Sequence, residues 1–188
     1  ETRESGSWGR SRLCATDSSA FLWPHRGRSA DSEASCGTSA LRSERLSMGG
    51  ILLDTNVLSE LMRAKPAAEV LNWFGRQQNA SYFVSVITRA EILLGIALLP
   101  AGKRRDGLAL AAEQMFIEDF AGRTLPFDDN CAAEYSLLVA ERTRRGHSIS
   151  TEDGQIAATA LSHDLSLASR NGKDFRGIAG LIVVNPLV

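Results

Sequence analysis

The chain has 188 residues, of which 44% are hydrophobic and 23% are charged, and its formal net charge is −1. This length suits one medium-sized domain with its own core, alone or with a tail. The charge is too low for general attraction to nucleic acid, and three cysteines are too few for a disulfide-stapled secreted scaffold. No apolar run approaches the roughly 20 residues of a membrane-spanning helix. We therefore expect a soluble, cytoplasmic protein with no membrane partner.

Residues 1–47 differ in composition from the rest of the chain. They contain seven arginines, eleven serines and six acidic residues but no lysine, and they show no hydrophobic periodicity. Such a segment cannot bury enough apolar surface to form a core, so we expect it to be disordered. Because Met48 leads directly into a regular pattern, we interpret 1–47 as a non-native extension and 48–188 as the folded domain. A natural RNA-binding arm is the alternative interpretation of 1–47.

From Met48 onward, short apolar or β-branched runs alternate with helical patterns. In chain order we expect a strand at 51–53, helices at 55–64 and from Pro66 onward, a strand at 82–86, helices at 87–99 and 103–121 with a break near Gly107, a strand at 125–127, helices at 129–145 and 152–163, and strands at 165–169 and 181–184. Strands that alternate with helices favour a parallel sheet covered on both faces. The predicted fold class is therefore α/β, a three-layer α/β/α sandwich whose central sheet is mainly parallel.

Two aspartates follow expected strands, at the edge where parallel sheets bind their ligands, and a third lies at the start of a helix that can lean over the same edge. Asp54 directly follows the strand at 51–53, although a helix N-cap would explain it equally well. Asp153 falls in the first turn of a predicted helix, where the helix dipole alone favours an acid. Asp174 follows the strand at 165–169 through a turn, and by itself it indicates nothing more than a loop.

Glu91 is the fourth acidic candidate, because its helical spacing places it on an apolar stripe. Its neighbours on that stripe are Ile87, Leu94 and Leu98. A carboxylate buried there needs a partner, since an unpaired buried ion costs several kcal/mol. The partner is either an arginine, such as Arg89 or Arg170, or a metal ion.

The side chains of all four acids can lie in one cleft at the carboxyl edge of the sheet. Four carboxylates in one cleft repel one another strongly unless cations compensate their charge. Sites made only of oxygen ligands suit Mg²⁺ or Mn²⁺. Two such ions can activate a water molecule and stabilise the leaving oxygen of a phosphodiester. The pattern thus indicates metal-dependent hydrolysis of a phosphodiester bond.

Four segments of the chain resemble the sequence blocks of PIN-domain ribonucleases, in particular the VapC-like toxins of bacterial toxin–antitoxin pairs. The segments are 52–60 (LLDTNVLSE), 85–95 (SVITRAEILLG), 150–158 (STEDGQIAA) and 167–175 (LASRNGKDF). They occur in the order and with the spacing of the family and together cover essentially 48–188. Residues 1–47 have no counterpart in the family.

The resemblance implies a PIN-like fold and a Mg²⁺- or Mn²⁺-dependent endoribonuclease that selects single-stranded RNA and acts as the toxin of a type II toxin–antitoxin system. It implies that Asp54, Glu91, Asp153 and Asp174 form a catalytic, metal-binding quartet and that Asn56 helps to hold the first aspartate. The implied partners are the RNA substrate, a second copy in a homodimer, and a cognate antitoxin through which alone the protein would contact DNA.

Four arginines are candidates for supporting roles. Arg142, Arg144 and Arg145 end the helix that precedes the Asp153 segment, and they form either a solvated helix end or a phosphate-contact patch for RNA. Arg170 orients a carboxylate, touches the scissile phosphate or forms a plain ion pair.

Two other functions stay open from the residues alone. The first is a catalytically silent PIN-like module that only binds a partner. The second is a phosphatase of the haloacid-dehalogenase type, which also places an aspartate after an apolar strand. That chemistry needs a second aspartate two positions later, where this chain has Asn56.

Overall fold

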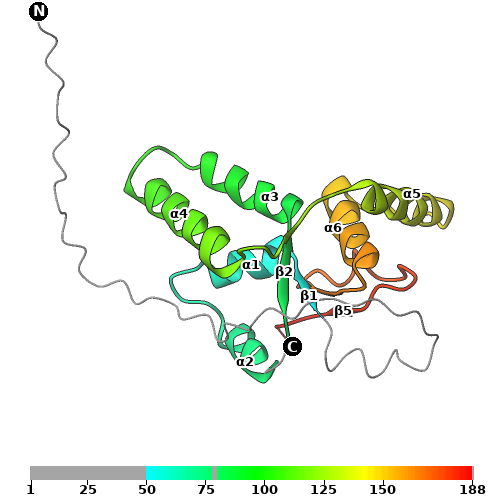
Figure 1. Ribbon diagram of the computed structural model, residues 1–188, viewed down its shortest axis with the longest axis horizontal. Helices are drawn as coiled ribbons and strands as arrows, with labels where there is room; N and C mark the ends of the chain where they lie inside the picture. The colour runs from blue at the N-terminus through cyan, green and yellow to red at the C-terminus, as the bar shows by residue number, and fades with distance from the viewer. Residues whose placement is uncertain (1–49, 78–79, 188) are drawn as a thin grey trace, which may run out of the picture.

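The computed structural model describes residues 50–77 and 80–187 (Figure 1). The predicted extension 1–47 and Met48 lie outside the described residues. The strands are β1 (Ile51–Leu53), β2 (Tyr82–Ser85), β3 (Thr124–Leu125), β4 (Ser166–Ala168) and β5 (Val183–Val184). The helices are α1 (Thr55–Leu61), α2 (Ala68–Arg76), α3 (Val86–Ala97), α4 (Lys103–Gln114), α5 (Asp129–Arg144) and α6 (Thr151–Ser162), and a π-helical segment, Met115–Asp119, continues α4.

The five strands form one sheet with the order β3-β2-β1-β4-β5, and every neighbouring pair is parallel. The prediction of a mainly parallel α/β fold is confirmed. The apolar strand β1 is central, and each of its three residues is buried, as expected for a strand covered on both faces. Leu53 is in register with Val84 on one side and with Ala168 on the other.

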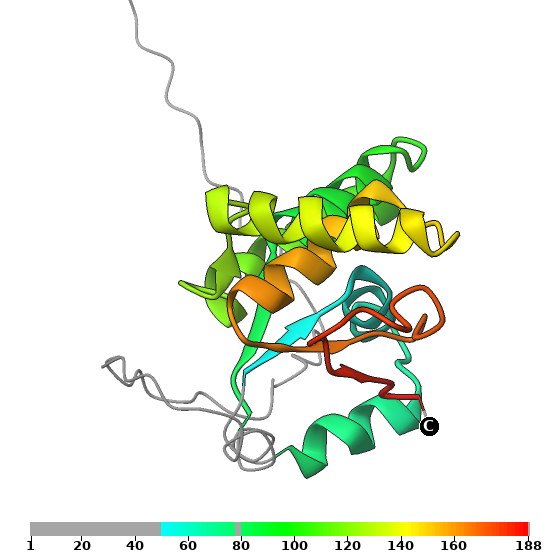
Figure 2. The same cartoon turned by 90° about the vertical axis from the view of Figure 1, so that its right-hand side faces the viewer.

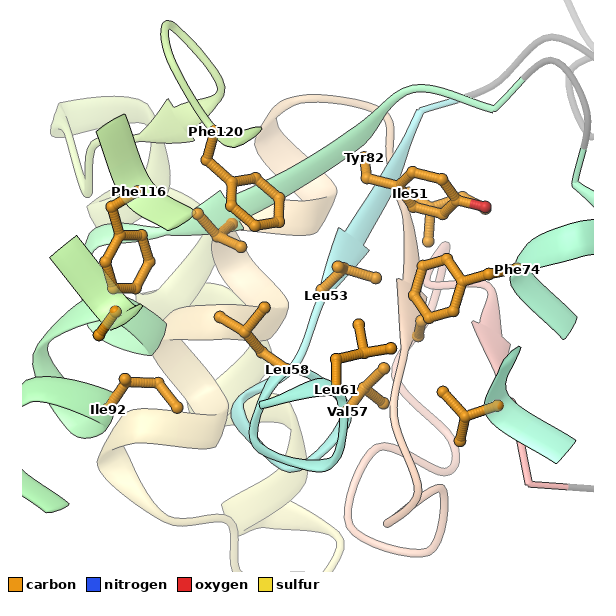
Figure 3. Packing of buried hydrophobic residues seen from close by; sticks show 14 of the residues in the cluster. Ile51, Leu53, Val57, Leu58, Leu61, Phe74, Tyr82, Ile92, Phe116 and Phe120 are labelled. Atoms are coloured by element: carbon orange, nitrogen blue, oxygen red, sulfur yellow. The ribbon is translucent and has the colours of Figure 1, made fainter. Parts of the chain in front are cut away.

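Successive residues of β1 point to opposite faces of the sheet and pack into two separate cores. Leu52 belongs to a cluster with Ile156 and other residues of α6, whereas Leu53 belongs to a cluster with residues of α1 and α2, including Leu58 and Phe74. Figure 2 shows α5 and α6 on one side of the strands and α2 on the other. Figure 3 shows Leu53, Leu58 and Phe74 within the same cluster. Helices therefore cover both faces, which confirms the three-layer prediction.

Several predicted boundaries are wrong by a few residues. Helix α1 ends at Leu61 rather than at 64, and α2 begins at Ala68, two residues after Pro66. The helix from 103 does not break at Gly107. Instead it widens near its end, where the amide of Phe120 donates to the carbonyl of Met115, five residues earlier, at 3.1 Å. Strand β3 starts one residue before the expected position.

No helix in the described ranges 50–77 and 80–187 combines the length and the hydropathy needed to cross a membrane.

Candidate active site

The register of the central strands brings Asp54 and Ser169 together. Asp54 follows Leu53 at the end of β1, and Ser169 follows Ala168 at the end of β4. Because Leu53 and Ala168 are partners in a parallel pair, the next residue of each strand lies at the same edge of the sheet. The hydroxyl of Ser169 donates to Oδ2 of Asp54 at 2.6 Å, and both residues are buried.

Two further hydrogen bonds fix the carboxylate of Asp54, which is 3% exposed. The backbone amide of Thr55 donates to Oδ1 at 2.7 Å, so Asp54 is also the N-cap of α1. Nδ2 of Asn56 donates to Oδ2 at 2.6 Å and to Oγ of Ser169 at 3.2 Å. The carbonyl oxygen of Asn56 in turn accepts from the backbone amide of Arg170 at 3.0 Å. The structure thus places Asn56 beside Asp54, in the position that the family resemblance implied, and places the backbone of Arg170 next to Asn56.

Glu91 reaches the same edge from α3, but it does not lie on the buried stripe that its spacing predicted. Leu94 and Leu98, its expected neighbours there, are 58% and 76% exposed. The buried residues of α3 are Thr88, Ile92 and Ile96. Glu91 is half-buried at the border of that face, and Oε2 accepts from the hydroxyl of Thr55 at 2.5 Å. Within the described part of the chain it forms no ion pair, and Arg89 instead lies over the ring of Phe116.

Asp153 and Asp174 approach from the other side of the edge. Asp153 is half-buried in the first turn of α6, and its amide donates to Oγ of the N-cap Ser150 at 3.0 Å. Asp174 lies in the loop after β4, where its carboxylate accepts from the side-chain amide of Asn171. The two carboxylates are close enough for the charge of Asp174 to help raise the pKa of Asp153.

A cleft of about 560 Å³ separates these side chains, and we call it the acidic cleft. It is lined by Asp54, Thr55, Asn56, Ser59, Glu60, Arg63, Glu91, Asp153 and Arg170. Three of the four predicted acids therefore share one cavity, and Asp174 stands next to it without lining it.

Burial and mutual repulsion disfavour the ionised aspartates of the cleft. Burial is the largest cause of the raised pKa of Asp54, and repulsion from Asp153 and Glu91 adds to it, against the hydrogen bonds from Ser169 and Thr55. Burial likewise raises the pKa of Asp153, with a smaller contribution from Asp174. Electrostatic repulsion therefore acts between Glu91 and Asp54, between Asp54 and Asp153, and between Asp153 and Asp174.

The side chains of residues 50–77 and 80–187 contain no group of three or more His, Cys, Asp or Glu that is arranged to hold a metal ion. Both oxygens of Asp54 accept hydrogen bonds, and the carboxylates of Glu91 and Asp174 are also engaged with neighbouring donors. The donor set itself fits Mg²⁺ or Mn²⁺, because carboxylate oxygens are the ligands that these hard cations prefer.

The three arginines at the end of α5 lie outside the acidic cleft. Arg142 is 7% exposed, and its guanidinium donates to the carbonyls of Arg176 at 2.8 Å and Ser148 at 3.2 Å. Arg142 therefore connects α5 to the two loops that contain Ser148 and Arg176. The prediction that Arg142 contacts RNA is wrong, because its side chain is directed into the protein. Arg144 and Arg145 are exposed beside Glu141, and their contact with RNA stays a prediction.

Five residues of the site were not predicted from the sequence, namely Thr55, Ser59, Glu60, Arg63 and Ser169. Thr55 and Ser169 donate to the acids, and Ser169 takes the same place after β4 that Asp54 takes after β1. The buried Glu60 accepts from Arg63 at 3.0 Å and from the amide of Ala67 at 3.1 Å, and these hydrogen bonds, above all that of Arg63, lower its pKa. The available clue was that Glu60 and Arg63 are three residues apart within the predicted helix 55–64.

We expect the stability of the metal-free protein to depend on the protonation of Asp54. A pKa that is higher in the folded state stabilises the fold at low pH, and this contribution is lost as the pH rises through the folded-state pKa. The difference in free energy of unfolding between Asp54→Asn and the wild type should therefore shift in favour of Asn as the pH rises above the ordinary pKa of an aspartic acid. Urea unfolding in EDTA across this range measures it, and a difference that is constant with pH would contradict the expectation.

A family model described as PIN domain matches residues 51–181. Plasmid stability protein StbB of Pseudomonas syringae pv. tomato is 43% identical over 136 residues, which cover 72% of this chain and 97% of that protein. VapC ribonuclease Y4jK of Sinorhizobium fredii is 42% identical over 136 residues, with 72% and 96% covered. Toxin FitB of Neisseria gonorrhoeae is also 42% identical over 136 residues, with 72% and 97% covered.

Solved structures give the same result for the fold. A structure of FitAB bound to an IR36 DNA fragment matches with a TM-score of 0.66 and 40% identity, over 73% of this chain and 96% of that chain. The crystal structure of FitAcB from Neisseria gonorrhoeae matches with a TM-score of 0.64 and 42% identity, over 72% and 97%. With the acidic cleft at the carboxyl edge of a parallel sheet, these matches show that the chain belongs to the PIN-domain family, among its VapC-like toxins.

Proposed function

We propose that this protein is a metal-dependent endoribonuclease and the toxin of a toxin–antitoxin pair. The observation that carries the proposal is the acidic cleft, into which β1, α3 and α6 each bring one carboxylate. None of Asp54, Glu91 and Asp153 forms an ion pair with another described residue. Relatives named VapC ribonuclease and toxin FitB, both 42% identical, support the same activity.

Mg²⁺ or Mn²⁺ belongs to the proposal as the cofactor. The ligands would be Asp54, Glu91, Asp153 and Asp174, which supply only hard oxygen donors. A divalent cation would offset the repulsion that helps to raise the pKa of Asp54 and of Asp153. When bound, it would activate a water molecule and stabilise the leaving oxygen of the phosphodiester.

The uncharged residues around Asp54 have a positioning role in this proposal. Asn56, Ser169 and the amide of Thr55 hold the carboxylate in one orientation, and the Thr55 hydroxyl does the same for Glu91. Such fixed geometry lowers the reorganisation needed when the substrate binds. Arg170 lines the cleft with an exposed side chain, which leaves its guanidinium available to the scissile phosphate.

The proposed partners follow from the same assignment. They are single-stranded RNA as substrate, a cognate antitoxin as inhibitor, and a second copy of the chain in a homodimer. Contact with DNA would occur only through the antitoxin, and the solved FitAB complex with a DNA fragment supports this arrangement. The proposed location is the cytoplasm, where the RNA substrate is found.

Cleavage of a panel of single-stranded RNAs by the purified protein tests the proposed function. We expect internal cleavage in Mn²⁺ or Mg²⁺, complete loss of cleavage in EDTA, and recovery when the metal is restored, because the carboxylates alone lack a positive charge to face the phosphate. Double-stranded RNA of the same sequences serves as the control. Cleavage that persists in EDTA would contradict the metal mechanism, and antitoxin binding without any cleavage would favour the silent module.

A further inference from the structure

A second cavity adjoins the acidic cleft and has no role in the proposed function so far. It has a volume of about 550 Å³ and lies between α1, α3 and the start of α4, so we call it the α3–α4 cavity. Ser59, Arg63 and Glu91 line both cavities, which are therefore adjacent. A ligand that binds in the acidic cleft can extend past these three residues into the α3–α4 cavity.

The walls of the α3–α4 cavity combine an aliphatic surface with two cations. Met62, Ile92 and Leu108 contribute to the apolar part. Arg63 and Arg104 contribute guanidinium groups, and Glu91 is the one acid, at the wall shared with the acidic cleft. Arg63 thus stands at the wall shared with the acidic cleft, and Arg104 adds a cation beyond it. Cations placed in this way suit the path of a polyanion.

Both arginines can offer donors to a phosphate. The guanidinium of Arg63 has five N–H donors, of which Nη1 binds the buried Glu60 at 3.0 Å. Glu60 is held in turn by the amide of Ala67, so it anchors Arg63 at the junction of the cavities. Arg104 forms no ion pair with any residue that the structure describes, whereas the adjacent Arg105 lies 3.6 Å from a carboxylate oxygen of Asp106.

We propose that the α3–α4 cavity is the subsite for the nucleotide next to the scissile phosphate of the RNA substrate, with Arg63 and Arg104 as its phosphate contacts. This inference rests on the proposed function. A volume of about 550 Å³ falls within the roughly 300–1,000 Å³ of ligand pockets. Single-stranded RNA presents unstacked bases that can enter such a pocket, while its phosphates follow the basic wall. The aliphatic surface would then select bases by shape.

Two matched pairs of variants test the arginines. In an Asp54→Asn background, which should not cleave, we would titrate a labelled single-stranded RNA of mixed sequence and follow fluorescence anisotropy at several salt concentrations. Arg63→Gln and Arg104→Gln should each weaken binding and reduce the slope of log affinity against log salt by about 0.7, the value for one phosphate contact of a single strand. Lys65→Gln and Arg105→Gln remove neighbouring cations that do not line the cavity, and they should leave the slope unchanged.

Gly95→Leu tests the cavity itself, because it fills the space without removing a charge. Gly95 lines the cavity from the middle of α3, and a Cβ atom added there meets nothing within 4 Å. Helix α3 should therefore tolerate leucine, which is a better helix former than glycine. Gly75→Leu in α2 is the control, since that position is equally open and lies outside the cavity. We expect only Gly95→Leu to weaken RNA binding.

The results separate this inference from the proposed function. RNA affinities of Arg63→Gln, Arg104→Gln and Gly95→Leu that equal those of their controls would overturn the subsite. The subsite would also be wrong if Gly95→Leu impaired binding of the antitoxin but not of RNA, because the cavity would then serve a protein. Cleavage by the wild-type protein in Mn²⁺ is measured in parallel. If it is observed while the variants behave as controls, the subsite fails and the ribonuclease function stands.

Discussion

Replacing Asp54 with asparagine should reduce RNA cleavage by a factor on the order of 10³ or more. Asp54 lines the acidic cleft close enough to Glu91 and Asp153 for their charges to help raise its pKa, and in the proposed function all three are ligands of the cation. Asparagine fills the same space but carries no charge, so the site would hold the metal less tightly. Initial rates on a single-stranded RNA in Mn²⁺, from protein with no trace of wild type, measure the effect.

A control substitution at another aspartate and a measurement of stability show whether the loss of cleavage is due to the acidic cleft. Asp129→Asn changes an exposed aspartate at the start of α5, outside the acidic cleft, and should leave the rate unchanged. The metal-free Asp54→Asn protein should melt no lower than the metal-free wild type at neutral pH, because burial raises the pKa of the native carboxyl. A large fall in melting temperature would instead assign Asp54 a structural role, and undiminished cleavage would refute the metal site.

Leu52→Ala should cost about 2–5 kcal/mol of unfolding free energy, a large part of the stability of a domain of this size. Leu52 is fully buried in the central strand, and it packs with Ile156, Leu167 and Phe175. Truncation leaves a cavity between the sheet and α6 that the surrounding side chains can fill only in part. Equilibrium urea unfolding, with the slope of the transition compared between variants, gives the difference.

The matched control is Leu137→Ala on α5, whose side chain is 66% exposed. The same chemical change should alter stability there by no more than about 0.5 kcal/mol. Similar losses at both positions would mean that Leu137 is buried in solution, for example against a second copy of the chain. A small loss at Leu52 would contradict the central position of β1.

The strands of the sheet and the position of Asp54 could be predicted from the sequence because each depends on a short run of neighbouring residues. An uninterrupted apolar run is required of a strand buried on both faces, and Asp54 follows such a run directly. Parallel topology then implies that residues following other strands meet it at one edge. Ser169 was overlooked because the predicted strand 165–169 included it, and only the pairing of β1 with β4 places it beside Asp54.

Two other errors have a different physical origin. Helix α3 carries apolar residues around its whole circumference, with Leu93, Leu94 and Leu98 all exposed, so periodicity alone could not identify its buried face. Arg142 belongs to a cluster of arginines that looks like a solvated helix end. Its burial depends on the carbonyls of Arg176 and Ser148, which only the folded loops bring within reach.

The hydrogen bond between Ser169 and Asp54 joins residues that are 115 positions apart in the chain. During translation, β1 leaves the ribosome long before β4 has been made, and until then the aspartate lacks the serine that orients it. The acids of α6 and of the loop after β4 are equally late. The complete set of acids can therefore come together only after β4 and the loop that follows it have been synthesised, when nearly the whole chain exists.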